Sequence, residues 1–349
     1  MLFRQLFHQE TGTYTYLLAG RQGGEALLID PVIDRVERYM QLLEELDLRL
    51  MKVVDTHVHA DHITAMGELR DRTKCVSVMG KEAPVDVVSM RVNDGDLITV
   101  EGVQMETLYT PGHTIDSYSF KMADRVFTGD TLLIRGTGRA DFQSGSSRDA
   151  YHSIFDKFLT LPDDMLVYPG HDYKGDTMST IGEEKAHNPR LQVSSAEEYI
   201  AIMDNLNLAD PKQMDVVVPA NIVMGRGQSD EEHPDWALTV GQLMVLQEQM
   251  DVLLVDLRED KEREANGVIP GSIHAPYGDL ANLIAPGGLL RGLAGDSKRP
   301  LVYYCAFGER SAMAVEASHE VDMDHISHLI GGIAAWAEAG GPVEAPDGG

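Results

Sequence analysis

Basic residues are scarce in this sequence of 349 residues. It holds 29 lysines and arginines against 56 aspartates and glutamates, which gives a formal net charge of −27. So acidic a surface repels the phosphates of nucleic acids and anionic lipid headgroups. We therefore expect neither nucleic acid nor a membrane as a partner, and an anionic substrate would need basic side chains gathered at its binding site.

Cysteine and long apolar runs are also lacking. Cys75 and Cys305 are far apart in the sequence, so a disulfide framework is implausible and a reducing compartment is favoured. No apolar run reaches the roughly 18 residues of a membrane-spanning helix. The segment from Met1 to Phe7 is not followed by the apolar stretch and cleavage site of a secretory signal. We expect a cytoplasmic protein.

The length and one change of composition predict two domains. Domains usually hold roughly 100–200 residues, so 349 residues suit two of them. Residues 224–234 are rich in glycine, serine and acidic residues, which is typical of an exposed linker. We place the linker at residues 226–235, the first domain at 1–225 and the second at 236–349.

Apolar periodicity predicts an α/β fold for both domains. In the first domain, apolar residues recur at helical spacing over residues 36–46. Strands, with antiparallel character in the middle of this domain, are expected at residues 1–7, 14–18, 26–31, 51–56, 75–79, 97–108, 117–121, 125–128 and 165–168. In the second domain, strands at 252–256 and 300–305 alternate with helices, notably 311–319, as in a parallel sheet.

Histidine and aspartate residues follow predicted strands at four places, and they are the strongest signal in the chain. They are His57, His59, Asp61 and His62 after the strand 51–56, and then His113, Asp130 and His171, each after an apolar run and a glycine or proline turn. Loops at the strand ends of α/β folds project side chains into one crevice. Imidazole and carboxylate groups suit a borderline divalent metal. From the residues alone, all seven ligands of a binuclear site are present.

The pattern H-x-H-x-D-H, followed by H, D and H, resembles the metallo-β-lactamase superfamily and, within it, the glyoxalase II-like branch. The resemblance covers about residues 1–225. It implies a four-layer αββα sandwich with a metal at one edge of the sheets. Four further stretches resemble the persulfide dioxygenases of that branch: residues 134–143, 171–173, 188–191 and 218–221.

The resemblance to persulfide dioxygenases implies one Fe(II) per chain, held by His57, His113 and Asp130. Two histidines and one carboxylate on one face of the metal leave positions open for the substrate sulfur and O₂. The four other members of the cluster would surround a vestigial second metal position and orient the ligands: His59, Asp61, His62 and His171.

Two more residues, Arg139 and Tyr173, match family positions that contact glutathione. A guanidinium fork and a phenol suit the carboxylates of glutathione. For each residue alone, a packing or surface role is equally open. Cys75 lies in a strand-like stretch, and we expect it to be a buried, inert thiol.

The second cysteine, Cys305, follows a predicted buried strand, and a helix is expected to begin near Ser311. The loop between them can aim backbone N–H groups at the sulfur, and a helix N-terminus adds positive potential, so a thiolate is favoured. A persulfide on Cys305 would be held in the same way. Arg310 adds a fixed positive charge, so Cys305 and Arg310 are the expected catalytic pair.

This region resembles single-domain rhodaneses over about residues 236–345. The supporting stretches are residues 256–259, 267–274 and 331–336, together with the cysteine loop. The resemblance implies transfer of sulfane sulfur through a persulfide on Cys305. Many thiosulfate sulfurtransferases carry an arginine directly after the cysteine. Here Ala306 takes that place and Glu309 adds a negative charge, so a preference for thiosulfate stays open.

Together the resemblances imply a non-haem iron dioxygenase that converts glutathione persulfide, with O₂, to sulfite and glutathione. The rhodanese domain would move sulfane sulfur between thiosulfate or sulfite and glutathione persulfide. One alternative is a binuclear thioester hydrolase of the glyoxalase II type fused to a sulfurtransferase, in which a rhodanese has no evident role. Another is a rhodanese that only carries sulfur, without turnover of its own. We expect small-molecule substrates and a homo-oligomer.

Overall fold

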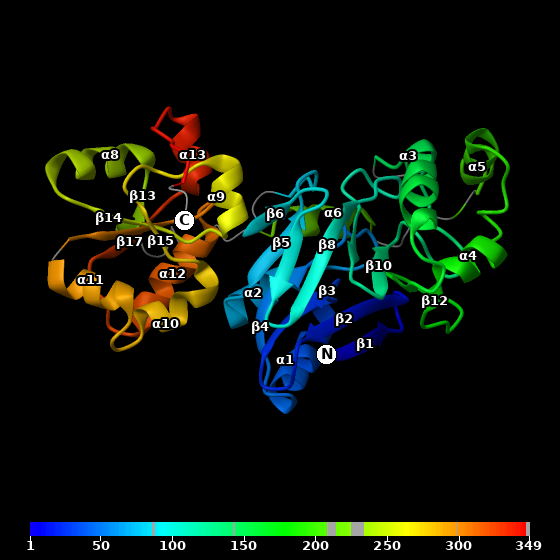
Figure 1. The fold of residues 1–349 in the computed structure, drawn as a ribbon, viewed down its shortest axis with the longest axis horizontal. Coiled ribbons are helices and arrows are strands. Elements are labelled where there is room, and N and C mark those ends of the chain that lie inside the picture. The colour runs from blue at the N-terminus through cyan, green and yellow to red at the C-terminus, as the bar shows by residue number, and fades with distance from the viewer. Residues whose placement is uncertain are drawn as a thin grey trace. The chain divides into compact units, whose positions relative to one another are not determined.

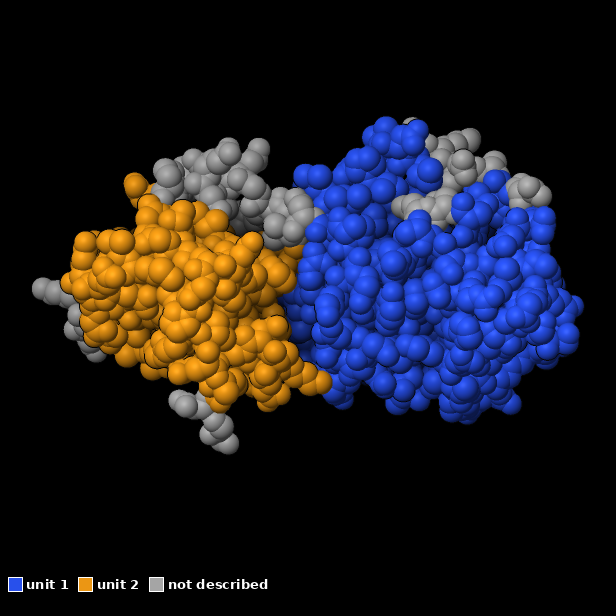
Figure 2. Space-filling view, turned by 90° about the horizontal axis from the view of Figure 1, so that it is seen from above, with its two compact units in different colours: residues 1–86, 90–224 blue, residues 87–89, 225–349 orange. Residues whose placement is uncertain are grey.

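The computed structural model describes residues 1–85, 88–141, 144–206, 208, 214–224, 234–297 and 299–346. The chain divides into two compact units, the first formed by residues 1–86 and 90–224 and the second by residues 87–89 and 225–349 (Figure 2). Two predicted features lie partly outside the described residues. They are the linker, at residues 226–233, and the stretch 134–143, at Phe142 and Gln143. In the described part of the chain, no helix combines the length and apolar character needed to cross a membrane.

Six strands form the first sheet of the first unit. In order across the sheet they are β1 (Leu2–His8), β2 (Thr13–Ala19), β3 (Glu25–Ile29), β4 (Arg49–Val54), β5 (Val76–Gly80) and β6 (Met90–Val92). The first three pair antiparallel, and β3 to β6 pair parallel. Helix α1 (Val36–Glu45) packs on this sheet through Tyr39, whose hydroxyl lies 2.9 Å from that of Thr15 on β2. Helix α2 (Met66–Thr73) packs on β4 and β5.

Six more strands form the second sheet. In order they are β12 (Ser179–Thr180), β11 (Leu166–Pro169), β10 (Arg125–Gly129), β9 (Tyr118–Lys121), β8 (Val103–Tyr109) and β7 (Leu97–Val100). Helices α3 (Ser147–His152), α4 (Ile181–His187) and α5 (Ala196–Met203) lie together beside this sheet (Figure 1). Their buried apolar residues, such as Ala150, Ile181 and Tyr199, form one core with Val126 and Val167 of the sheet. The unit also contains α6 (Met214–Ile222).

The single strand expected at 97–108 is wrong, because these residues form the hairpin β7–β8. The chain turns at Glu101 and Gly102, and Gly102 has φ +72°, a left-handed conformation that glycine adopts freely. The apolar pattern continues on both sides of the turn, with Ile98, Val100 and Val103 all buried, so it does not reveal the reversal.

The two sheets face each other through aromatic rings. The Tyr16 ring on β2 lies 4.9 Å from Phe127 on β10 and 5.7 Å from Tyr168 on β11, measured between centroids. The Tyr16 hydroxyl donates a 2.6 Å hydrogen bond to the Pro169 carbonyl, which ties the buried ring across the interface. Helices cover both sheets on the outside, and this confirms the predicted αββα sandwich.

The second unit is built on a parallel sheet of five strands. In order they are β13 (Ala237–Leu238), β17 (Ile326–Leu329), β16 (Leu301–Tyr304), β14 (Leu253–Asp256) and β15 (Ile273–His274). Helices α8 (Val240–Gln249) and α13 (Gly332–Glu338) lie on one face, and α10 (Leu280–Ile284), α11 (Leu289–Ser297) and α12 (Glu309–Glu320) lie on the other (Figure 1). Helix α9 (Asp260–Asn266) follows β14. The parallel sheet was expected, and α12 begins two residues before the predicted start at 311.

Short 3-10 and π-helical turns complete the elements of both units. They are η1 (Ile33–Arg35), η2 (Ser153–Lys157), η3 (Phe158–Thr160), η4 (Pro234–Trp236) and η5 (Tyr277–Asp279), of which η2 is π-helical. The turn η4 contains the last two residues of the linker expected at 226–235.

Candidate metal centre and reactive cysteine

The three predicted metal ligands and the four residues predicted around a vestigial second metal position lie in loops at one edge of the sandwich. The group His57 to His62 follows β4, and His113 follows β8. Asp130 comes directly after β10, and His171 follows β11. Because β8 and β10 both pair antiparallel with β9, while β10 and β11 pair parallel, the carboxyl ends of these three strands meet at the same edge.

Three of the seven are the predicted iron ligands, and they converge on one point. His57, His113 and Asp130 each offer one ligand atom, and these atoms lie within 4.8 Å of one another. The His113 Nδ1–H donates to the carbonyl of Arg139 at 2.7 Å, which leaves Nε2 directed at the Asp130 carboxylate, 3.6 Å from Oδ2. The arrangement therefore presents an imidazole nitrogen and a carboxylate oxygen toward a common point.

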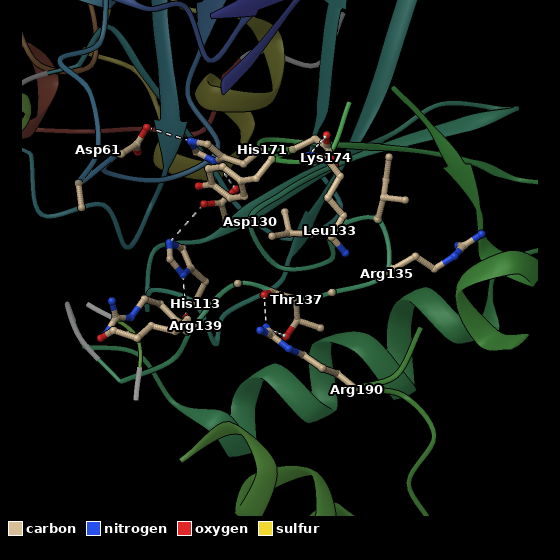
Figure 3. A pocket seen from close by; sticks show the side chains of 17 residues that line it. Asp61, His113, Asp130, Leu133, Arg135, Thr137, Arg139, His171, Lys174 and Arg190 are labelled. Carbon is tan, nitrogen blue, oxygen red and sulfur yellow. Dashed lines mark hydrogen bonds and ion pairs between the residues drawn. The ribbon is translucent and has the colours of Figure 1, made fainter. Parts of the chain in front are cut away.

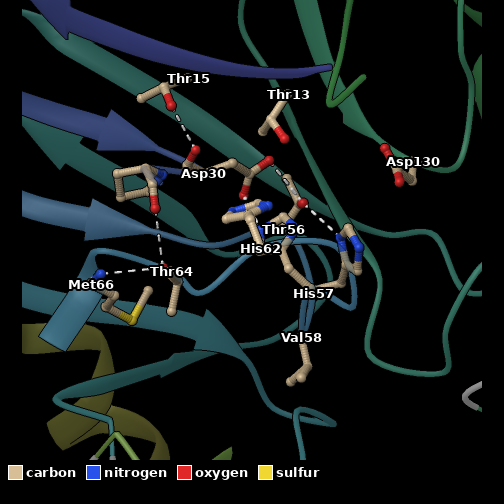
Figure 4. A network of polar contacts seen from close by, with 12 residues as sticks. Thr13, Thr15, Asp30, Thr56, His57, Val58, His62, Thr64, Met66 and Asp130 are labelled. Atoms are coloured by element: carbon tan, nitrogen blue, oxygen red, sulfur yellow. Dashed lines mark hydrogen bonds and ion pairs between the residues drawn. The ribbon is translucent and has the colours of Figure 1, made fainter. Parts of the chain in front are cut away.

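A buried chain of hydrogen bonds fixes the ring of His57 (Figure 4). Asp30 accepts from the Thr56 backbone N–H at 2.7 Å and from its hydroxyl at 2.9 Å. The Thr56 oxygen can then accept from His57 Nδ1, 2.9 Å away, so that Nε2 is the free nitrogen. Burial, together with His59 and His113, holds the pKa of His57 well below its usual value. The ring is therefore neutral, as a metal ligand must be.

The other four predicted residues form a second group beside the first. His59, Asp61 and His62 also bring one potential ligand atom each within 4.8 Å of one another. His171 bridges the two groups: its Nδ1 lies 2.7 Å from Asp130 Oδ1 and its Nε2 lies 2.9 Å from Asp61 Oδ2 (Figure 3). Burial lowers the pKa of His171, but the two carboxylates outweigh burial and raise it well above its usual value.

Two ring nitrogen atoms of this second group have no hydrogen-bond partner among the described residues. Within the described residues, His59 Nδ1 and His62 Nε2 are buried without a hydrogen-bond partner. The other ring nitrogens are used, since His59 Nε2 lies 3.2 Å from Asp30 and His62 Nδ1 lies 2.9 Å from Asp61. Buried polar atoms are rarely left unpaired. The geometry alone therefore suits a cation or a water at this position as well.

Sequence reasoning missed several residues that hold the centre together. Asn221 of the stretch 218–221 donates to the carbonyls of His59 and His62 at 3.0 and 2.9 Å and accepts from the Thr64 N–H, so it fixes the histidine loop. The stretch was noted in the sequence without a role for this residue. Asp30 carried a usable signal, since it is an aspartate directly after a buried strand, like Asp130.

A cavity of about 390 Å³ opens onto Asp130, His113 and His171. Its wall includes residues 133–139 and four cationic side chains, Arg135, Arg139, Lys174 and Arg190 (Figure 3). Of the four, only Arg139 was predicted. The Arg139 guanidinium lies against the carboxylate of Asp141, with contacts of 2.6 and 2.8 Å. Arg190 is half-buried, and it donates to the carbonyl and hydroxyl oxygens of Thr137.

Tyr173, the second predicted glutathione contact, lies at the rim of this cavity. Its side chain is 74% exposed, and its ring stacks on that of His171 with centroids 5.9 Å apart. Gly12, at φ +75°, makes room for this ring, because a Cβ there would lie 2.8 Å from the Tyr173 ring. The structure thus brings Tyr173, Arg139 and two of the predicted metal ligands, His113 and Asp130, around one cavity.

In the second unit, Cys305 directly follows the central strand β16 and is fully buried. Its sulfur receives the Gly308 N–H at 3.1 Å, and the Ser311 hydroxyl lies 3.7 Å away. Gly308, at φ +98°, ends the loop and caps α12, whose N-terminus adds positive potential near the sulfur. A Cβ on Gly332 would lie 2.4 Å from the Cys305 carbonyl, so this glycine allows α13 to approach the loop.

Arg310 does not extend freely into solvent. It is buried, and its guanidinium meets both carboxylate oxygens of Glu262 on α9 at 2.8 and 2.5 Å. Burial raises the pKa of Glu262, but Arg310 outweighs burial and lowers it below its usual value. Sequence reasoning missed this partner, since 48 positions separate the two residues. Cys75 is buried just before β5, as expected.

Comparisons with known proteins match both units. A family model described as "Metallo-beta-lactamase superfamily" matches residues 9–87 and 82–171, and one described as "Rhodanese-like domain" matches residues 239–339. The proteins named "Persulfide dioxygenase ETHE1, mitochondrial" from Mus musculus and Homo sapiens are each 47% identical over 228 residues. The match covers 64% of this chain and 89% of each relative.

Solved structures match as well. The crystal structure of ETHE1 from Myxococcus xanthus is 52% identical, with a TM-score of 0.62, and the match covers 63% of this chain and 98% of that one. A metallo-beta-lactamase structure from Staphylococcus aureus has a TM-score of 0.60 over 94% of this chain and 98% of its own, at 19% identity. At that identity the likeness concerns the fold alone.

Proposed function

We infer the activity of this chain from its family: it belongs to the persulfide dioxygenases of the metallo-β-lactamase superfamily and carries a rhodanese-like domain in addition. We propose that residues 1–225 form a domain that converts glutathione persulfide, O₂ and water to glutathione and sulfite. The observation that carries this proposal is the convergence of two histidines and one aspartate, His57, His113 and Asp130, of which His113 and Asp130 line a cavity with cationic side chains in its wall.

The residues fit one divalent iron. His57 and His113 each commit Nδ1 to a hydrogen bond, so both Nε2 atoms are available, and Asp130 keeps Oδ2 on the side of His113. Two imidazoles and one carboxylate are the donor set of non-haem iron oxygenases. When bound by these three side chains, Fe(II) would supply open coordination positions for a sulfur ligand and O₂.

The surrounding protein would orient these ligands. Asp30 and Thr56 hold His57, the Arg139 carbonyl holds His113, and His171 takes up the second oxygen of Asp130. Such partners fix the tautomer and direction of each ligand, and their loss usually costs 10–100-fold in metal affinity or activity. We therefore assign His59, Asp61, His62 and His171 to orientation of the centre rather than to a second metal.

The cavity would bind the glutathione part of the substrate. Glutathione carries two carboxylates, and Arg190, Lys174 and Arg139 bring three cationic groups to the cavity wall of an otherwise acidic chain. Tyr173 would add a phenol at the rim. Arg139 already forms an ion pair with Asp141, so a substrate carboxylate at Arg139 has to share or displace Asp141. Arg190 contacts the uncharged oxygens of Thr137, so it has no carboxylate of the protein to displace in that contact.

For the second unit we propose sulfane-sulfur transfer through Cys305, within a rhodanese domain of residues 236–349. The Cys305 thiolate attacks the outer sulfur of glutathione persulfide or thiosulfate, and the donor's S–S bond breaks. Glutathione thiolate or sulfite then leaves with the electron pair. The Gly308 N–H and the N-terminus of α12 favour negative charge on the Cys305 sulfur and on a persulfide formed there.

A binuclear thioester hydrolase is the second candidate for the first unit. The unpaired His59 Nδ1 and His62 Nε2 favour it, because these atoms could complete a second metal site. Family membership and the rhodanese-like domain favour the dioxygenase, since both activities would then handle the same sulfur. The homo-oligomeric state and the cytoplasmic location stay predictions, and so does turnover by the rhodanese domain as opposed to sulfur carriage.

Metal analysis combined with O₂ uptake separates the two candidates. We expect the purified full chain to hold about one iron and to consume O₂ when preformed glutathione persulfide is added, with sulfite as the product. Two zinc ions per chain, with thioester hydrolysis and no O₂ uptake, would contradict the proposal. The thioester assay on the same preparation is the control.

A further inference from the structure

A fully buried carboxylate lies outside the metal centre, on helix α4. The side chain of Glu184 has no exposed surface, and four donors surround it. Its Oε2 accepts from the Arg135 backbone N–H at 2.9 Å and from Asn188 Nδ2 at 2.8 Å. Its Oε1 accepts from the Ser179 hydroxyl at 2.6 Å and from the Arg135 guanidinium. Glu184 therefore ties α4 to the chain at Arg135 through both main chain and side chain.

Arg135 belongs to a tight turn of unusual conformation. Its φ is +55°, which non-glycine residues seldom adopt. Leu133 and Gly136 exchange two backbone hydrogen bonds across the turn, at 3.0 and 3.2 Å. Asn188, which donates to Glu184, also donates to the Gly136 carbonyl at 2.9 Å. Glu184 and its partner Asn188 thus stabilise a backbone shape that the sequence does not favour by itself.

The residues that follow this turn touch the proposed metal ligands. The Gly138 N–H donates to the Asp130 carbonyl at 2.7 Å, and the Arg139 carbonyl accepts from His113 Nδ1 at 2.7 Å. The approach is close, since a Cβ on Gly138 would lie 2.1 Å from the Asp130 carbonyl oxygen and 2.9 Å from His113 Nδ1. A shift of this segment would therefore move a ligand or break the hydrogen bond that orients it.

We propose that Glu184 is a positioning residue for the metal ligand His113, acting through residues 135–139. The carboxylate fixes the turn at Arg135, the turn places the Arg139 carbonyl, and that carbonyl sets the direction of the His113 ring. The same segment carries the Arg139 side chain and contacts Arg190 through Thr137, so it also forms the wall of the substrate cavity. The inference rests on the proposed assignment of His113 as a ligand.

The test is a titration of the metal-free full chain with Co(II), which reports ligand geometry through its absorption bands without turnover. Glu184→Gln keeps the size of the side chain but loses its charge and one acceptor. We expect its Kd for Co(II) to rise about tenfold and its absorption bands to change, as for other partners of ligating histidines. The matched control is Glu183→Gln. Glu183 is exposed and meets the same Arg135 guanidinium at 3.2 Å, and its variant should bind Co(II) like the wild type.

Arg135→Gln provides a second test if Glu184→Gln does not fold. Arg135 is partly exposed, and we expect a smaller rise in Kd in the same direction. Circular dichroism and the thermal midpoint of the metal-free chain report folding separately. Wild-type Co(II) affinity and bands in a folded Glu184→Gln, even with a lower thermal midpoint, would overturn the positioning role alone. Unchanged Co(II) binding by His57→Ala would overturn the ligand set itself, and with it this inference.

Discussion

The proposed metal centre and the reactive cysteine differ in how many hydrogen-bond partners the protein gives to their reactive atoms. In the first unit, His59 Nδ1 and His62 Nε2 are buried without a hydrogen-bond partner among the described residues. Beside them, the ligand atoms of His57, His113 and Asp130 lie within 4.8 Å of one another. In the second unit, the Cys305 sulfur receives the Gly308 N–H and lies beside a hydroxyl. The first centre thus leaves buried polar atoms for a cation or a water to satisfy, whereas the sulfur of the second has a donor from the protein itself.

The two centres also differ in the sign of the charge that surrounds their reactive atoms. Asp130 and Asp61 concentrate negative charge, and neighbouring histidines lower the pKa of both carboxyl groups despite burial. Around Cys305, the helix N-terminus and Arg310 supply positive potential instead. Arg310 forms an ion pair with Glu262 at 2.5 Å, so its guanidinium is held in place by the fold. These opposite charges agree with the two proposals, a metal at the first centre and an anionic sulfur at the second.

The largest expected effect comes from removing a metal ligand. His57→Ala should lose both iron and O₂ uptake, to levels below detection, because one of the three protein ligands is missing. Sulfur transfer by Cys305 should persist at the wild-type rate. Iron analysis, an oxygen electrode and a sulfurtransferase assay on one preparation check this. His152→Ala, at an exposed histidine on α3, is the control. An iron-free variant that also lost sulfur transfer would break the proposed separation.

A smaller effect is expected from the cavity wall, where two arginines can be compared. Arg190→Met should raise KM for glutathione persulfide roughly 10–100-fold with iron retained, since a hydrogen bond to a charged group contributes about 1.5–3 kcal/mol. Arg139→Met and Tyr173→Phe should raise KM less, because Asp141 competes for Arg139 and the Tyr173 side chain is largely exposed. Steady-state kinetics, together with the iron content of each variant, test these changes in KM. Unchanged KM in all three variants would rule out this carboxylate site.

The smallest effect is expected at the other cysteine. Cys75 is buried just before β5 and belongs to neither group of proposed site residues, so Cys75→Ala should leave O₂ uptake and sulfur transfer within about twofold of the wild type. It should lower the free energy of unfolding by about 1 kcal/mol, as ordinary core truncations do. Denaturant unfolding and both activity assays check this. A loss of sulfur transfer in Cys75→Ala would mean that Cys305 does not act alone.

Much of the fold and the reactive residues could be predicted because their signals are local. Strand-end motifs such as His57 to His62 and the loop at Cys305 occupy short stretches with a recognisable pattern. The partners that hold them could not be predicted, since Glu184 meets Arg135 and Glu262 meets Arg310 across 49 and 48 positions. Such pairs depend on how helices, strands and loops pack together, and a short stretch of sequence does not predict this packing. The hairpin at Gly102 was missed because its apolar pattern runs through the turn.

The division of labour is tested most directly by assaying Cys305→Ser with two sets of substrates. A serine hydroxyl cannot carry sulfane sulfur as a persulfide, so sulfur transfer should be lost while iron content stays normal. With preformed glutathione persulfide, O₂ uptake should remain near the wild-type rate. With thiosulfate and glutathione alone, it should disappear, because no persulfide reaches the iron. O₂ uptake from thiosulfate and glutathione, or its loss with preformed persulfide, would contradict two separate centres.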